Sequence, residues 1–288
     1  MHYLAVVSLV WALSFGLIGN SLTGLDSIFV ATARLGIAGL VFLPFLRFST
    51  SSPSTPYRLM VCGAIQFGIM YVCYMKAFLY LPSHLVALFS IFTPLYVVLI
   101  HDLRQRRFHS RYLYAALLSV VGAAIIRLRS GSTESIWTGF ALMQVAGLAF
   151  GFGQVYYRDW KRKNPKIPQL NSFAWLYMGG FLVTLFASFF LTDWAKITPV
   201  GWQAGIILYL GVIASGLGFF LWNKGASLTS PGTLAAFNNA VVPIAMASSL
   251  FLFGEISDLE PNAVIRLILG VLCILAAVVL AEKTSAES

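Results

Sequence analysis

Long charge-free apolar stretches recur along this 288-residue chain, and they limit its fold more than any other feature. Several exceed about 18 residues, the length at which a helix can cross the hydrocarbon core of a membrane. Only 10% of the residues are charged, against about 25% in a typical soluble domain. The runs do not alternate apolar with polar residues, as strands of a membrane barrel would; residues 85–100, LVALFSIFTPLYVVLI, are an example. The sequence therefore predicts an all-α membrane protein.

Ten transmembrane helices are predicted from apolar runs that are bounded by charges or turn residues. They cover about 3–22, 27–46, 58–80, 83–101, 111–127, 135–157, 170–191, 200–222, 231–254 and 262–281. The stretch 59–101 has a single charge and could be taken for one helix, but its length would be about 65 Å, twice the hydrocarbon core. Pro82 supplies a helix breaker near its middle. We therefore expect two helices joined by a short turn.

The Lys and Arg residues outside the helices predict the orientation. With a cytoplasmic N-terminus, 13 of them lie on the cytoplasmic side and four on the other. Cytoplasmic loops of membrane proteins carry such an excess of positive charge. We therefore expect both termini in the cytoplasm and the protein in a plasma membrane, the inner membrane of a bacterium. The net charge of +9 is explained by these loops, and nucleic acid is not an expected partner.

An internal repeat is visible in the fourth and ninth predicted helices. Pro82 and Pro94 recur as Pro231 and Pro243, with an offset of 149 residues in both cases. The offset superimposes helices that are five apart, so the chain divides into two five-helix halves, 1–130 and 131–288. A repeat with an odd number of helices inserts its second copy upside down. The predicted fold is two inverted five-helix repeats, in which these four prolines break or gate helices.

Short motifs resemble the drug/metabolite transporter superfamily, in its ten-helix EamA-type branch. They are Trp11-Ala12-Leu13-Ser14-Phe15, the run from Arg34 to Leu40, and Pro243 followed by Gly254-Glu255. The sequence departs from the pattern at His101-Asp102 and Arg106, near the place where many relatives have a Gly-Glu pair. The resemblance implies a central cavity and transport of small metabolites, often outward. It names no substrate.

Two basic residues lie inside predicted helices, where charges are costly and need a partner or a wet cavity. Arg34 is placed to hold two helices together through backbone carbonyls, or to attract an anionic group of a substrate. Lys76 is close to the Pro82 turn and is placed to reach the membrane surface, or to bind a carboxylate in a cavity. Both alternatives stay open for each residue.

Polar and aromatic side chains in the helices are the other candidates for substrate contacts. Ser90 and the pair Asn238 and Asn239 occupy matching places in the repeat, near mid-membrane, where inverted-repeat transporters bind substrate. Packing between helices or an aromatic belt at the membrane surface is the alternative role for such residues. The predicted substrate-binding set is Trp11, Ser14, Arg34, Tyr71, Tyr74, Lys76, Ser90, Gln144, Gln154, Trp222, Asn223, Asn238 and Asn239.

Acidic residues are absent from the interior of every predicted helix. A carboxylate proton relay and multivalent cation cargo are therefore disfavoured. Coupling to protons would need His84, but its place beside Pro82 suggests a histidine at the membrane interface. The leading hypothesis is a secondary transporter, expected to be an exporter, of amino acids or related neutral, zwitterionic or anionic compounds. A membrane-embedded enzyme would need clustered His, Asp, Glu or Cys residues, and a channel or receptor is the other alternative. No catalytic residue, metal or cofactor is predicted; a monomer and a homodimer both stay open.

Overall fold

The computed structural model describes residues 2–47, 54–104, 106, 133–228 and 231–258, together with the single positions 265, 268, 269, 271–273 and 276. Every regular element in these ranges is helical. Within the described residues, seven helices are long and apolar enough to cross a membrane. They are His2–Ser21, Ser27–Phe45, Thr55–Ala77, Ser83–Arg104, Ile136–Lys163, Gln169–Leu191 and Gly201–Leu228. The predicted helix 111–127 lies outside the described residues, and 262–281 lies largely outside them.

The first helix consists of α1 (His2–Gly16) and a π-helical segment, η1 (Leu17–Ser21), and the second begins with α2 (Ser27–Phe42). The third runs through α3 (Ser54–Gly63), the π-helical η3 (Ala64–Ile69) and α4 (Met70–Ala77). After Pro82 the next helix comprises α5 (Ser83–Phe89), a 3₁₀ turn, η4 (Ser90–Phe92), and α6 (Thr93–Arg104). The predicted break at Pro82 is confirmed.

The later helices are α8 (Thr133–Lys163) and α9 (Gln169–Leu191). Then follow α10 (Gly201–Tyr209), the π-helical η6 (Leu210–Leu217) and α11 (Gly218–Leu228). Last come α12 (Pro231–Ala247), a π-helical turn, η7 (Ser248–Leu252), and the short η8 (Glu255–Asp258). Helix α8 is longer than the predicted 135–157, because its basic residues after 157 continue the helix beyond the apolar part instead of ending it.

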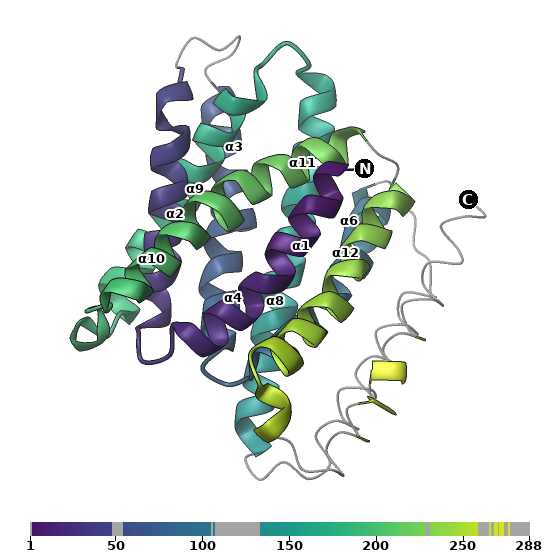
Figure 1. The fold of residues 1–288 in the computed structure, drawn as a ribbon. Coiled ribbons are helices and arrows are strands. Elements are labelled where there is room, and N and C mark those ends of the chain that lie inside the picture. Colours follow the sequence, from purple (N-terminus) through teal and green to yellow (C-terminus); the bar gives the residue numbers. More distant parts are fainter. Residues whose placement is uncertain are drawn as a thin grey trace.

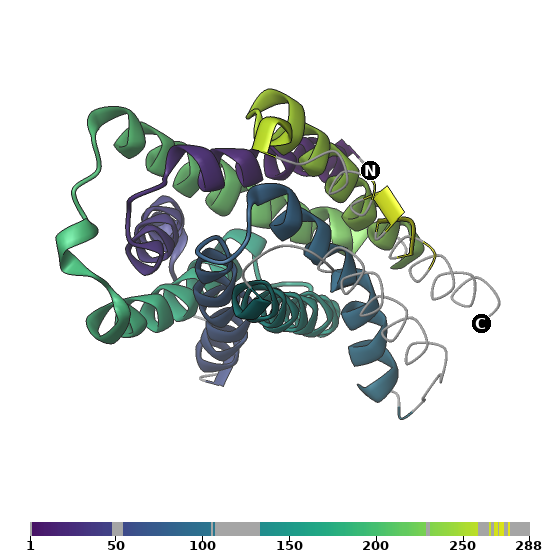
Figure 2. The ribbon, with the colours of Figure 1, turned by 90° about the horizontal axis from the view of Figure 1, so that it is seen from below.

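The helices pack in two groups that share α8. Helix α9 contacts α2, α3 and η3, and α12 runs beside α1 and also contacts α5, as Figure 1 shows for α1 and α12. Helix α8 contacts α4 on one side and α6 on the other. Figure 2 views the bundle from below, with the blue α3–α4 helix and the teal α8 helix nearly end-on beside one another. The first-half segment α5–α6 and its 149-residue counterpart α12 are thus neighbours.

Two glycines allow α3 and α9 to approach closely. A Cβ atom added at Gly63 would overlap the backbone carbonyl of Leu176, and one added at Gly179 would overlap that of Met60. Only glycine lets helix backbones come so near within a membrane protein. The contact fixes α9 against the third helix and, through it, one side of the central cavity.

Candidate functional site

A cavity lies in the middle of the bundle, with walls from seven of the described helices. Its empty space is about 750 Å³, a value that includes the solvent space at its opening. Its lining residues are Trp11, Ser14, Phe15, Arg34, Met70, Tyr71, Tyr74, Ser90, Thr93, Met143, Ala146, Gly147, Phe150, Phe219, Asn238 and Val241. The cavity is mostly apolar and aromatic, with a few polar groups at its edges.

Arg34 is the charged group of this cavity, and it is held by neutral partners. Its Nη2 donates to the hydroxyl of Tyr71 at 3.1 Å, and its Nε donates to Oγ of Ser215 at 3.2 Å. The guanidinium also lies 4.8 Å from the ring centroid of Tyr71. Only 3% of the residue is exposed. Among the residues that the structure describes, no carboxylate lies within ion-pair distance of Arg34. Arg34 is therefore a buried cation without a counter-ion in the part of the chain that the structure describes.

Aromatic rings form one wall, which we call the aromatic layer: Trp11, Phe150 and Phe219. The ring centroids of Trp11 and Phe219 are 4.8 Å apart, and those of Phe150 and Phe219 are 5.5 Å apart. The indole nitrogen of Trp11 donates to the carbonyl of Ala214 at 2.8 Å. That carbonyl belongs to the π-helical η6, where the wider turn displaces backbone carbonyls from the regular α-helical ladder. The hydrogen bond fixes the face that Trp11 presents to the cavity.

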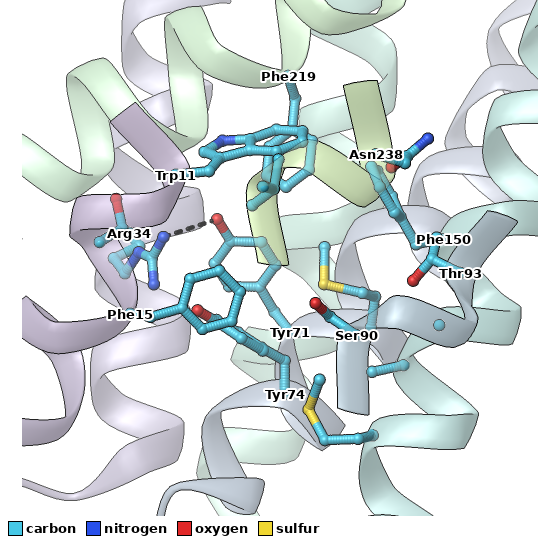
Figure 3. A pocket seen from close by; sticks show the side chains of 16 residues that line it. Trp11, Phe15, Arg34, Tyr71, Tyr74, Ser90, Thr93, Phe150, Phe219 and Asn238 are labelled. Atoms are coloured by element: carbon cyan, nitrogen blue, oxygen red, sulfur yellow. Dashed lines mark hydrogen bonds between the residues drawn. The ribbon is translucent and has the colours of Figure 1, made fainter. Parts of the chain in front are cut away.

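Polar side chains lie on the other side of the cavity, opposite Arg34. Figure 3 shows Ser90, Thr93 and Asn238 there, with Arg34 and Tyr71 facing them across the aromatic rings. Proline at 94 has no N–H for the carbonyl of Ser90, so the chain tightens into a 3₁₀ turn and Thr93 N–H bonds that carbonyl instead. The hydroxyl of Ser90 donates to the carbonyl of Ala87 at 2.6 Å. The predicted helix break at Pro94 thus becomes a local change of helix type at the cavity wall.

The structure brings seven of the predicted substrate-binding residues together in the cavity: Trp11, Ser14, Arg34, Tyr71, Tyr74, Ser90 and Asn238. Lys76, Gln144, Gln154, Trp222 and Asn223 do not line it, and the side chain of Asn239 lies outside the described part of the chain. Gln144 instead accepts a hydrogen bond from the hydroxyl of Tyr96 at 2.7 Å. Of the four predicted helix-breaking prolines, Pro82 precedes α5, Pro94 is in the first turn of α6, Pro231 begins α12 and Pro243 lies within it.

Sequence reasoning missed most of the apolar lining. The missed residues include Phe15, Met70, Met143, Phe150 and Phe219. Phe15, Met70, Met143 and Phe150 each lie three or four residues from another lining residue on the same helix, so the helical period could have located them. Phe219 is the one lining residue from the described helix Gly201–Leu228. An apolar residue in an apolar helix carries no other signal.

A separate polar cluster ties three segments together at one end of the bundle. The carboxylate of Glu255, in η8, accepts the backbone N–H groups of Ser83 at 3.2 Å and His84 at 3.1 Å. Its oxygen Oε2 lies 2.6 Å from Nδ1 of His84, and Oε1 accepts from the amide of Asn20 at 3.0 Å. Burial raises the pKa of the Glu255 carboxyl, but hydrogen bonds from His84, Ser83 and Asn20 outweigh it and hold the pKa at about 2.

Gly254 lets the chain turn so that Glu255 can reach α5. Its φ is +75°, in the left-handed region that favours glycine. The preceding π-helical turn ends at Leu252, and η8 begins at Glu255. The carboxylate then meets the free N–H groups at the N-terminus of α5, where negative charge is favourable. The Gly-Glu pair that the sequence singled out therefore joins the end of the ninth predicted helix to the start of the fourth.

Comparison with known proteins agrees with this architecture. The sequence model of the EamA-like transporter family matches residues 1–128 and 137–281. A protein named "Biotin transporter" from Escherichia coli (strain K12) is 41% identical over 257 residues, which are 88% of this chain and 85% of that protein. A "Probable biotin transporter" from Pseudomonas aeruginosa is 41% identical over 272 residues, 94% of this chain and 93% of that protein.

Two further matches have lower sequence identity. "Protein PecM" from Dickeya dadantii is 25% identical over 233 residues, 80% of this chain and 74% of that protein. One solved crystal structure superimposes with a TM-score of 0.65 at 15% identity and covers 96% of this chain and 94% of its own. At that identity the superposition bears on the fold alone.

Proposed function

The chain belongs to the EamA-like transporter family, and we propose that its substrate is biotin, bound in the central cavity with its carboxylate at Arg34. The protein is a membrane transporter, as its family and its relatives are. Biotin is suggested as the substrate by two relatives at 41% identity, whose names specify biotin. The residues that line the cavity supply the physical argument.

The observation that carries the proposal is the buried Arg34 without a counter-ion. A buried cation is costly unless an anion or strong hydrogen-bond acceptors compensate it. The partners present are the hydroxyls of Tyr71 and Ser215 and the sulfur of Met75, all neutral. A guanidinium binds a carboxylate through paired, charge-assisted hydrogen bonds. A substrate carboxylate would therefore complete the charge balance of the cavity.

The walls suit the remainder of the biotin molecule. Biotin joins a flexible acid chain to a compact fused ring that has apolar faces and a cyclic urea. The aromatic layer offers flat apolar surfaces for such a ring, and Ser90, Thr93 and Asn238 offer polar groups on the side away from Arg34. Biotin is an anionic compound, within the expected range of substrates.

Amino acids, the other substrates that the sequence suggested, fit this cavity less well. Their ammonium group needs an anionic or strongly accepting partner. No carboxylate is among the residues that line the cavity in the described ranges. The charge of Arg34 would also repel an ammonium group held nearby. The cavity favours a monoanion without an amine.

We also propose that the transporter works by alternating access between two inverted five-helix halves, 1–130 and 131–288. Three observations support this division. The family matches the chain twice, at 1–128 and 137–281. The proline pairs repeat with a 149-residue offset. The π-helical segments η3 and η6 also overlap when shifted by that offset. On this proposal, ten helices span a bacterial inner membrane with both termini in the cytoplasm, as the loop charges indicate.

Uptake of radiolabelled biotin into proteoliposomes that contain the purified protein tests the substrate. We expect uptake that saturates with biotin concentration, is competed by unlabelled biotin, and is stimulated when the vesicles are preloaded with biotin. The carboxamide of biotin should compete at least about tenfold less well, because one charge-assisted interaction is worth about 1.5–3 kcal/mol. Uptake no faster than in empty vesicles, or linear without saturation, would contradict the proposal.

A further inference from the structure

Two glutamine side chains that are buried near the cavity have amide atoms without a hydrogen-bond partner among the described residues. Neither Nε2 nor Oε1 of Gln66 has a hydrogen-bond partner in the described part of the chain, and Nε2 of Gln154 has none there either. Gln66 is 0% exposed and Gln154 is 3% exposed. A buried amide that forms no hydrogen bond destabilises the folded protein, and its presence in a native structure calls for an explanation such as an ordered water, strain or a functional role. We call Gln66 and Gln154 the inner polar pair.

The inner polar pair lies where η3 packs against α8. The side chain of Gln66 lies directly against Gly153, where a Cβ atom would overlap it, and Gln154 is the next residue on α8. The oxygen of Gln154 accepts from the indole nitrogen of Trp222 at 3.5 Å, while its Nε2 has no hydrogen-bond partner among the described residues. Gln66 also belongs to the π-helical η3, a kind of segment that is frequent at functional sites.

Gln66 and Gln154 lie on the same helix faces as residues that line the cavity. Gln66 comes four residues before the lining residue Met70, and Gln154 comes four residues after the lining residue Phe150. Trp222, which bonds Gln154, comes three residues after Phe219. All three steps lead toward the same end of the bundle, where α3 begins and α8 and α11 end, which is the end predicted to be cytoplasmic. The pair therefore lies beyond the aromatic layer, on the cytoplasmic side of the cavity.

The 149-residue offset independently relates this site to the cavity. It pairs Gln66 with Ser215, the residue that accepts from Arg34 in the cavity wall. Both residues are in π-helical segments, η3 and η6. In inverted-repeat transporters the two halves form the two sides of the path. Gln66 thus occupies, in the first half, the position that Ser215, a hydrogen-bond partner of Arg34, occupies in the second half.

We propose that Gln66 and Gln154 form a second substrate station, which binds the cyclic urea of the substrate once the aromatic layer has opened toward the cytoplasm. A cyclic urea has one carbonyl and two N–H groups. The free N–H groups of Gln154 can donate to its carbonyl, and the oxygen of Gln66 can accept from its N–H groups. The amide groups that are unpaired while the aromatic layer is closed then form hydrogen bonds with the substrate as it passes. This inference rests on the proposed biotin transport and adds a station and its ligand group to it.

The test uses Gln66→Met and Gln154→Met in the full-length protein, because methionine has similar length and no amide. Three quantities are measured: the melting temperature, the Kd for biotin, and the initial uptake rate in proteoliposomes. The matched control is Gln144→Met. Gln144 also lies on α8, but its amide oxygen accepts a hydrogen bond from Tyr96 and the residue does not line the cavity. Uptake is also measured for 5-(tetrahydrothiophen-2-yl)pentanoate, which keeps the acid chain and the sulfur ring but lacks the urea.

We expect Gln66→Met to have a melting temperature no lower than that of the wild type, since no hydrogen bond is lost. Its Kd for biotin should stay within about threefold, while its uptake rate falls about tenfold or more, the value of one or two hydrogen bonds. Its preference for biotin over the analogue without the urea should fall by a similar factor. Gln144→Met should lose melting temperature and keep the preference.

Two results would overturn the proposal. One is wild-type uptake and substrate preference in both Gln66→Met and Gln154→Met. The other is a lower melting temperature and slower uptake with the preference unchanged, which would make the glutamines structural. If the wild type itself transports the analogue but not biotin, the proposed substrate fails instead, and the two failures are distinguishable.

Discussion

The Nδ1 atom of His84 lies 2.6 Å from the carboxylate oxygen Oε2 of Glu255, although the residues are 171 positions apart in the sequence. Both are buried, with 3% and 8% of their surfaces exposed. The contact joins the start of α5 to η8, and the amide of Asn20 connects η1 to the same carboxylate. Three segments from the two halves of the chain are thereby tied at one end of the bundle, the end predicted to face outward.

Replacing this carboxylate by an amide should destabilise the protein. In Glu255→Gln one of the two oxygens becomes an N–H donor, which then faces the backbone N–H group of Ser83 or that of His84. We expect a loss of about 1–3 kcal/mol in the free energy of unfolding, because buried donors lose their acceptor. The melting temperature in detergent measures it. Asp193→Asn is the control, since its ion pair with Lys196 is exposed and contributes little to stability. Equal shifts in the two variants would contradict the account.

The depressed pKa of Glu255 predicts how this stabilisation depends on pH. The pKa is about 2 in the folded protein, against 4.5 for the free group. A lowered folded-state pKa stabilises the protein above the unfolded value, and the contribution is lost as the pH falls toward the folded value. The melting-temperature gap between wild type and Glu255→Gln should therefore be full at about pH 5 and shrink toward about pH 3. A gap that grows over this interval would show that the carboxylate is not held in its charged form.

The close approach of α3 and α9 makes Gly63 intolerant of a methyl group. Gly63→Ala places a Cβ atom against the carbonyl of Leu176, and we expect a destabilisation of about 1–3 kcal/mol, the usual cost of overpacking. Gly39→Ala is the control, because nothing lies within 4 Å of a Cβ at that position, and alanine favours the helix. Thermal unfolding of both variants should give shifts of opposite sign. A neutral Gly63→Ala would mean that the two helices are further apart.

Asn238 gives a direct test of the cavity wall opposite Arg34. We expect Asn238→Ala to raise the KM for biotin uptake about fivefold or more, since it removes one hydrogen-bonding group of about 1 kcal/mol from the lining. The control Asn164→Ala lies at the junction of α8 and α9, where its amide bonds the carbonyl of Trp160, and should keep the wild-type KM. An unchanged KM in Asn238→Ala would remove this residue from the binding site.

Much of the helical layout could be predicted from the sequence, because lipid forces long apolar runs into helices. The break at Pro82 was predictable for the same kind of reason, since proline lacks an N–H group. The π-helical segments were not. In η6 the carbonyls displaced from the ladder accept from Trp11 and from the hydroxyl of Tyr177, and these partners belong to distant helices. Such segments depend on tertiary contacts that no local pattern shows.

The cavity could be predicted only in part. Polar residues in apolar helices stand out, and this identified Arg34 and Asn238. The same signal identified Gln144, which faces Tyr96 and not the cavity, because a sequence does not tell which neighbour a polar side chain meets. Gln66 was not singled out at all, and its importance comes from the missing partners in the folded bundle. The link from His84 to Glu255 also requires the fold, since it depends on how α12 lies beside α5.

The central claim is that Arg34 binds the carboxylate of the substrate, and calorimetric titration of purified variants with biotin tests it most directly. Arg34→Met should weaken binding about tenfold to a hundredfold, as expected for a lost charge-assisted hydrogen bond of about 1.5–3 kcal/mol. It should also bind biotin and its carboxamide equally. Ser215→Ala removes a partner of Arg34 but keeps the charge, so it should still prefer biotin. If Arg34→Met retains the wild-type Kd and the wild-type preference for the carboxylate, the account is contradicted.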